Sequence, residues 1–63
     1  MNQKQEQRIV NRCRAILQAR FTDHEAVKRY LEMVEDAGDF DLYKGISEAE
    51  LVVDYQAYLQ AVS

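Results

Sequence analysis

The sequence predicts an all-α fold, a small three-helix bundle that forms a single domain over residues 1–63. The chain contains no proline and only two glycines, the two residue types that are least favourable inside helices. Apolar residues recur with helical spacing in three separate segments, and a helix start signal precedes two of these segments. The expected helices cover about residues 3–20, 23–37 and 48–61.

The first helix is predicted from an apolar stripe that recurs every three or four residues. Its members are Ile9, Val10, Cys13, Ile16, Leu17 and Phe21. On another face, Lys4, Arg8 and Arg12 follow one another at intervals of four residues, with Arg14 beside them. The segment therefore predicts an amphipathic helix with a basic face, of which Arg8, Arg12 and Arg14 are the main residues.

A capping box is expected to start the second helix. In the run Thr22-Asp23-His24-Glu25, the hydroxyl of Thr22 would cap the helix while Glu25 reaches back to the cap. The apolar face that follows consists of Ala26, Val27, Tyr30, Leu31 and Val34. Gly38 is the expected end of the helix, because glycine readily adopts the left-handed conformation found just after helices.

The third helix has a second capping box at its start. Ser47 and Glu50 form this box, and Ile46 and Leu51 are placed around it as a hydrophobic staple. The apolar stripe of this helix consists of Leu51, Val52, Tyr55, Tyr58, Leu59 and Val62. The segment 38–46 before it is short, so we expect an extended connector that lies against the core.

The size of the chain bounds its stability. A protein of 63 residues buries only about 60% of the surface that its unfolded form exposes, so it is marginally stable alone. Cys13 is the only cysteine and His24 the only histidine, which excludes an intrachain disulfide and gives no zinc-like spacing. We expect no metal and no cofactor, and we expect the chain to self-associate, with a second copy completing the bundle, or to dock on a partner.

The N-terminal sequence predicts a cytoplasmic protein. The run MNQKQEQRIV lacks the apolar segment of a signal peptide. No apolar run approaches the ~20 residues that span a bilayer, so no membrane partner is expected. A single thiol without an export signal is typical of a reducing compartment.

Charge divides the chain into two halves of opposite sign. Residues 1–30 contain seven basic residues against three acidic ones, a net charge of +4. Residues 31–63 contain one basic residue against eight acidic ones, a net charge of −7. Such an asymmetry bears on the choice of partners and not on the fold.

No catalytic residues are predicted, and we do not expect an enzyme. His24 falls at the start of the second helix, where a polar surface position is expected, and Cys13 belongs to the apolar stripe of the first helix. A buried thiol behaves as a small apolar side chain. Carboxylates that work as acid and base need a cleft that perturbs their pKa values, which a chain of this size rarely encloses.

An acidic cluster surrounds the expected end of the second helix. It consists of Glu32, Glu35, Asp36, Asp39 and Asp41. Negative charge in the last turn of a helix opposes the helix dipole by about 0.3–1 kcal/mol per group, so a compensating positive charge is expected. Arg12, Arg14 or Arg20 supplies it, within the chain or across a dimer, or else the acids face a basic partner.

Two aromatic residues, Phe40 and Tyr43, lie among these acids and are of the type that anchors protein interfaces. The predicted partner-binding site therefore consists of Glu32, Glu35, Asp36, Asp39, Phe40, Asp41 and Tyr43. The alternative is that Phe40 and Leu42 cover the core, which is compatible with a buried Phe40 and an exposed Tyr43.

These features favour a protein–protein interaction module, an adaptor or inhibitor of a larger cytosolic assembly of the kind found among bacterial and phage accessory proteins. In one variant, the acidic face imitates nucleic acid and occupies a groove made for it. The main alternative is a nucleic-acid-binding module that uses the basic face of the first helix. A third hypothesis is a structural homo-oligomer without another partner.

Overall fold

The computed structural model describes residues 3–63, and this part of the chain consists of four helices without any strand. The helices are α1 (Gln3–Arg20), α2 (His24–Ala37), α3 (Phe40–Tyr43) and α4 (Glu48–Val62). The all-α prediction is confirmed, and the three long helices match the expected ranges to within one residue at each end. The short helix α3 was not expected, so the arrangement is not a plain three-helix bundle.

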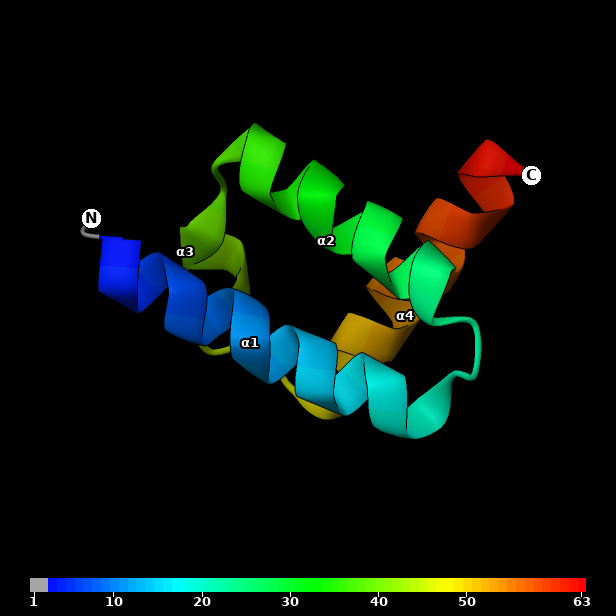
Figure 1. Ribbon diagram of the computed structural model, residues 1–63, viewed down its shortest axis with the longest axis horizontal. Helices are drawn as coiled ribbons and strands as arrows, with labels where there is room; N and C mark the ends of the chain where they lie inside the picture. Colours follow the sequence, from blue (N-terminus) through cyan, green and yellow to red (C-terminus); the bar gives the residue numbers. More distant parts are fainter. Residues whose placement is uncertain (1–2) are drawn as a thin grey trace.

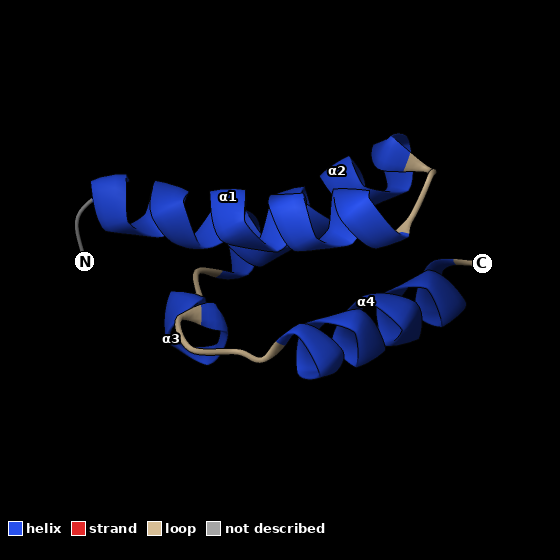
Figure 2. Cartoon of the chain, turned by 90° about the horizontal axis from the view of Figure 1, so that it is seen from below, coloured by secondary structure: helices blue, strands red, loops and turns tan. Residues whose placement is uncertain are grey.

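The helices are arranged in two layers. The chain runs along α1, turns sharply and returns along α2, so that these two helices form one layer (Figure 1). In the view of Figure 2, α3 and α4 lie on the other side of the molecule from α1. Contacts join α1 to α2, α3 and α4, and α2 to α4, so the core lies between the layers.

The core is apolar and every helix contributes to it. Its buried residues are Ile9, Val10, Cys13, Leu17, Val27, Tyr30, Leu31, Val34, Phe40, Leu51 and Tyr55. Aromatic rings concentrate where α2 and α4 meet. Tyr30 contacts Tyr55 and Tyr58 with ring centroids 5.3 and 5.4 Å apart, and Phe21 contacts Tyr55 at 4.7 Å. All three contacts have the edge-to-face geometry that aromatic pairs favour.

The start of α2 differs from the expected capping box. The N-cap is Asp23 and not Thr22, and the Asp23 side chain accepts a hydrogen bond of 3.2 Å from the backbone N–H of Ala26. A carboxylate at this position also complements the positive end of the helix dipole, which explains why the aspartate caps in place of the threonine. The expected end is confirmed, since Gly38 has a φ of 72° and its N–H bonds to the carbonyl of Val34.

The start of α4 agrees with the sequence. Ser47 is the N-cap, and its hydroxyl accepts a hydrogen bond of 3.2 Å from the backbone N–H of Glu50. Leu51 is fully buried and Ile46 is half-buried against the same core, as a hydrophobic staple requires.

The expectation of an extended connector over residues 38–46 was wrong, because residues 40–43 form the single-turn helix α3. Phe40 is buried and Tyr43 packs partly buried against the core. Leu42 is 70% exposed, so the expectation that it also covers the core was wrong. Residues three apart lie on one face of a helix but on opposite faces of an extended chain. A helical turn is therefore the conformation that lets both rings reach the core.

Among residues 3–63, no helix combines the length and the apolar character that crossing a membrane requires.

Candidate functional site

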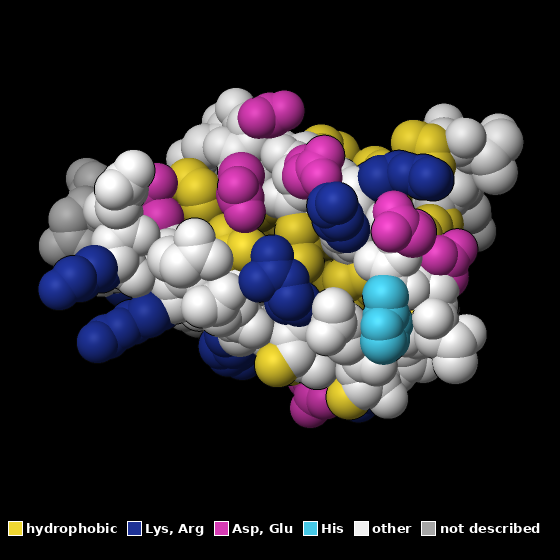
Figure 3. Space-filling view, in the orientation of Figure 1, with side chains coloured by type: hydrophobic (Ala, Val, Ile, Leu, Met, Phe, Trp, Pro, Cys, Tyr) yellow, Lys and Arg dark blue, Asp and Glu magenta, His cyan; other side chains and the backbone are white. Residues whose placement is uncertain are grey.

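A groove lies between the first half of α1 and the last turn of α2, where α3 closes one end. It encloses about 310 Å³. Its lining residues are Gln3, Glu6, Gln7, Val10, Glu35, Asp36 and Phe40. In Figure 3, apolar side chains are visible in the hollow between α1 and α2, with acidic side chains above it over α2.

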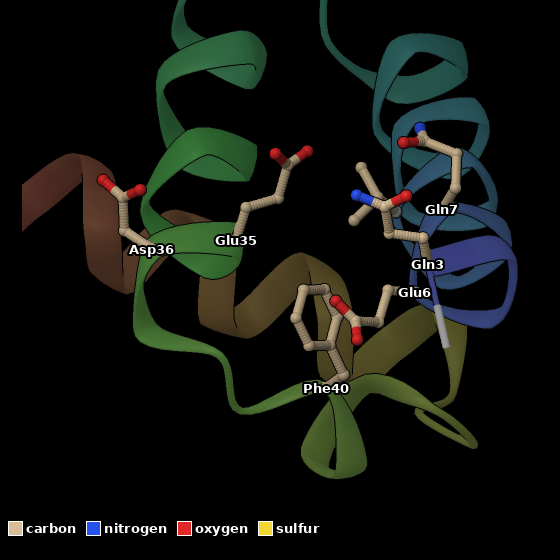
Figure 4. Close-up of a pocket in the computed structure, with 7 residues that line it drawn as sticks. Gln3, Glu6, Gln7, Glu35, Asp36 and Phe40 are labelled. Atoms are coloured by element: carbon tan, nitrogen blue, oxygen red, sulfur yellow. The ribbon is translucent and has the colours of Figure 1, made fainter. Parts of the chain in front are cut away.

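Carboxylates from two different helices border this groove. Figure 4 shows Glu35 reaching from α2 towards Gln3 and Gln7 on α1, while Glu6 lies in front of the Phe40 ring. Asp36 lies at the rim and points away from α1 in this view. The groove therefore brings together acids that are far apart in the sequence.

The floor of the groove is apolar and well packed. Val10 is 2% exposed and Phe40 is 8% exposed. Both side chains belong to the hydrophobic core, so the floor is part of the folded structure and does not need a ligand to form it. Because both side chains are almost fully buried, they offer little surface to a ligand, and the accessible lining of the groove is mostly polar with a negatively charged rim.

The acids of the groove have no cationic partner in the described chain. Among residues 3–63 the only ion pair joins Arg20 and Glu48, whose Nε and Oε1 atoms are 3.2 Å apart. Pairing of the acidic cluster with Arg12, Arg14 or Arg20 of the same chain is therefore not observed. Pairing across a dimer and pairing with another protein remain as predictions.

The structure divides the predicted site residues into two groups. Glu35, Asp36 and Phe40 line the groove, although Phe40 does so as part of its floor and not as an exposed anchor. Glu32, Asp39 and Asp41 are exposed outside the groove. They extend the negative surface around the end of α2 without sharing its cavity.

Tyr43, the last residue of the predicted site, is partly buried and faces α4. Its hydroxyl donates a hydrogen bond of 3.1 Å to Oδ2 of Asp54, and the hydroxyl of Tyr30 donates to the same oxygen. Burial raises the pKa of the Tyr30 hydroxyl, and its hydrogen bond to Asp54 raises that pKa further. Burial also raises the pKa of Tyr43. Tyr43 therefore links α3 to α4, and its contact with a partner stays a prediction.

The predicted basic face is present on α1. Arg8 and Arg12 are exposed, whereas Arg14 is half-buried and donates a hydrogen bond of 3.0 Å to the side chain of Asn11. These three arginines have no acidic partner among residues 3–63. Figure 3 shows basic side chains along the lower edge of the molecule, over α1.

The two residues considered for catalysis lie in different environments. Cys13 is 1% exposed in the core, and burial raises the pKa of its thiol. This shift disfavours the reactive thiolate. His24 is exposed at the first position of α2. In the described part of the chain, histidine, cysteine and acidic residues do not gather into a group that could hold a metal ion.

Sequence reasoning missed the contribution of α1 to the groove, namely Gln3, Glu6 and Gln7. A signal was present, because Glu6 precedes Ile9 and Val10 by three and four residues and therefore shares their face of the helix. Which helix ends lie side by side is a property of the packing, and it does not follow from the pattern of a single helix.

This arrangement of carboxylates can accept a positively charged side chain. Comparisons of the chain with models of protein families, with curated proteins and with solved structures find no match, so the function has to be inferred from the geometry alone.

Proposed function

We propose that the groove binds a basic segment of another protein, and that the chain thereby serves as an adaptor or inhibitor of a larger assembly. The observation that carries this proposal is the pair of carboxylates, Glu6 and Glu35, that two helices direct to one hollow without an ion-pair partner among residues 3–63. A lysine or arginine side chain would place its charge between the two acids, where charge-assisted hydrogen bonds to both carboxylates would hold it.

The negative residues outside the groove would assist the binding of a basic partner. Glu32, Asp39 and Asp41 are exposed around the same helix end, and they would attract a basic partner over a longer range. Such charges increase the rate and the specificity of association more than its affinity. A partner that normally binds nucleic acid would carry a suitable basic surface, in which case the acidic face would act by imitation.

The test uses a short peptide that alternates arginine and leucine, titrated into the 15N-labelled protein and followed by two-dimensional NMR. We expect the largest shifts at the amides of the residues that line the groove. The variant Glu6→Gln/Glu35→Gln should weaken binding about tenfold, which corresponds to about 1.4 kcal/mol. Equal shifts across the whole acidic surface would contradict the proposal.

The matched control is Asp39→Asn/Asp41→Asn. It removes the same number of negative charges from the same region, but from residues that do not line the groove. We expect a smaller loss of affinity, which decreases further as salt screens the long-range attraction. If both double variants weakened binding equally at high salt, the groove would have no special role.

The second candidate function is nucleic-acid binding through α1. It is favoured by the exposed guanidinium groups of Arg8 and Arg12, which have no ion-pair partner within residues 3–63. Binding of this kind would weaken steeply with salt, because phosphate contacts release counterions. A salt titration against a generic duplex, repeated with Arg8→Gln/Arg12→Gln, distinguishes it from the first proposal. Affinity for the duplex that is independent of these arginines would exclude α1 as the binding element.

A further inference from the structure

The outward face of α4 is apolar along most of its length. Ala49, Val53 and Ala57 recur at intervals of four residues and line a shallow hollow of about 380 Å³ together with Glu50 and Asp54. Val53 is 65% exposed. An exposed helix face normally carries charges of both signs, but α4 contains three acidic residues and no basic one. This face therefore lacks a covering element within the described chain.

The outward face of α1 has the opposite character. Lys4, Arg8 and Arg12 are exposed at intervals of four residues, followed by the exposed small residues Ala15 and Ala19. The helix carries five basic residues against one acidic residue, a net charge of +4, whereas α4 carries −3. The two faces are thus complementary in charge, and both have small side chains that allow helices to approach closely.

The spacing of the charges also matches. Four helical residues rise about 6 Å, so the distance along the axis from Arg8 to Arg12 equals that from Glu50 to Asp54. Asp54 accepts its two tyrosine hydrogen bonds at Oδ2, which leaves Oδ1 for an external guanidinium. Two ion pairs can therefore form at once along two packed helices.

The positions of the two faces determine the type of assembly. In Figure 2, α1 and α4 lie on opposite sides of the molecule, so one neighbouring copy cannot cover both faces. A contact between unlike faces of identical chains is heterologous, and it closes into a ring or continues as a filament.

We propose that copies of this chain associate head to tail, with the basic face of α1 docking on the apolar and acidic face of α4 of the next copy. The occupant of the α4 face is therefore a second copy. The contact lies away from the acidic groove, so the inference holds or fails independently of binding in that groove, whereas it uses the same arginines as the second candidate function.

A two-fold pairing of α4 with itself fits the charges less well. Glu50 and Asp54 lie along one edge of the hollow. An antiparallel pair centred on Val53 would bring the carboxylates of both copies to the same side of the interface, where they repel one another. Pairing with α1 replaces this repulsion by attraction.

The experiment measures mass by sedimentation equilibrium over a range of protein concentrations. We expect the wild type at low salt to reach at least twice the monomer mass of 7.4 kDa, and to return towards the monomer as salt screens the ion pairs. Two variants each disable one face: Arg8→Glu/Arg12→Glu on α1, and Glu50→Gln/Val53→Gln/Ala57→Gln on α4. Each variant alone should remain monomeric.

An equimolar mixture of these two variants is the decisive sample. Each variant retains the face that the other lacks, so the mixture should form dimers and nothing larger. Monomers in the mixture, or a wild type that is monomeric at every concentration, would overturn the proposal. Association of the arginine variant alone would overturn it too, because that result requires α4 to pair with itself.

Lys28→Glu/Arg29→Glu is the matched control. It reverses two exposed basic residues on α2 and gives the same net charge as the α1 variant, and it should associate as the wild type does. Loss of association in this control would mean that net charge alone governs the mass, which contradicts a specific contact. Circular dichroism establishes that every variant is folded.

Discussion

The two ends of α2 contact surroundings of opposite character. Near the middle and start of the helix, Tyr30 and its aromatic neighbours are packed edge to face, and the Tyr30 hydroxyl is bonded to Asp54. Near its end, Glu35 and Asp36 have no ion-pair partner among residues 3–63. In the first region the buried hydroxyl has a hydrogen-bond partner, whereas in the second the exposed carboxylates lack a positively charged partner within the described residues.

This difference suggests a division within α2: its aromatic part stabilises the fold, and its acidic end does not. In the described chain, no buried side-chain polar atom lacks a hydrogen-bond partner, so the packing is complete without the acids of the groove. Acids in the last turn reduce helix stability. Under the proposed function these acids are kept for binding, and the following experiments test whether stability and binding are separated in this way.

The largest expected effect is the loss of the aromatic region. Tyr55 is 1% exposed and contacts both Phe21 and Tyr30. Tyr55→Ala should lower the free energy of unfolding by about 3–5 kcal/mol, as large-to-small core substitutions do. Urea denaturation followed by circular dichroism measures this. The control Gln56→Ala, at an exposed position of the same helix, should change stability by less than about 0.5 kcal/mol.

The hydrogen bond to Asp54 is the next largest contribution. Tyr30→Phe keeps the buried ring but removes the hydroxyl that donates to Asp54. Bonds to charged groups contribute about 1.5–3 kcal/mol, and because Asp54 is exposed we expect the lower end of that range. A stability equal to that of the wild type would show that water replaces the hydroxyl at no cost.

The same hydroxyl predicts how stability depends on pH. Burial and the bond to Asp54 raise the pKa of Tyr30 above its ordinary value, so the folded protein holds this proton more tightly than the unfolded chain. The contribution of this hydroxyl to the free energy of unfolding is fully present below about pH 10. It is lost as the pH rises above that value, at up to about 1.4 kcal/mol per pH unit. Tyr30→Phe should show a shallower decline in urea titrations across this range.

The acidic end of α2 should behave in the opposite way to the aromatic region. Glu35→Gln removes a charge that opposes the helix dipole and should raise stability by about 0.3–1 kcal/mol. The same change at Glu48, which lies in the first turn of α4 and pairs with Arg20, should lower stability by a similar amount. Thermal unfolding of both variants tests whether the first raises and the second lowers the melting temperature. Destabilisation by Glu35→Gln would mean that this acid has a structural role.

Most of the helical framework could be predicted from the sequence. The stripe that contains Leu51 and Tyr55, and the cap at Ser47, both appear in the structure as expected. Helical periodicity is a local property, and each stripe spans several turns. The turn at α3 was missed because its four residues are too few to show a period, and its conformation depends on where the core receives Phe40.

The candidate site was predicted only in part. Glu35 and Asp36 were found because acids at a helix end conflict with the dipole, a conflict that is visible in the sequence. Glu6 was missed because it belongs to the groove only through the packing of α1 against α2. The hydrogen bond from Tyr43 to Asp54 was not foreseen either, because it depends on how α3 packs against α4.

The attachment of α3 has a consequence for the dynamics of the groove. A single helical turn has no stability of its own, and α3 is held by the burial of Phe40 and by the bond from Tyr43 to Asp54. Tyr30 holds the same carboxylate independently, so α3 can detach while the contact between α2 and α4 persists. Local unfolding of this turn would remove Phe40 and one end of the groove at a free energy below that of global unfolding. The lifetime of the groove is therefore set by the attachment of four residues and not by the whole fold.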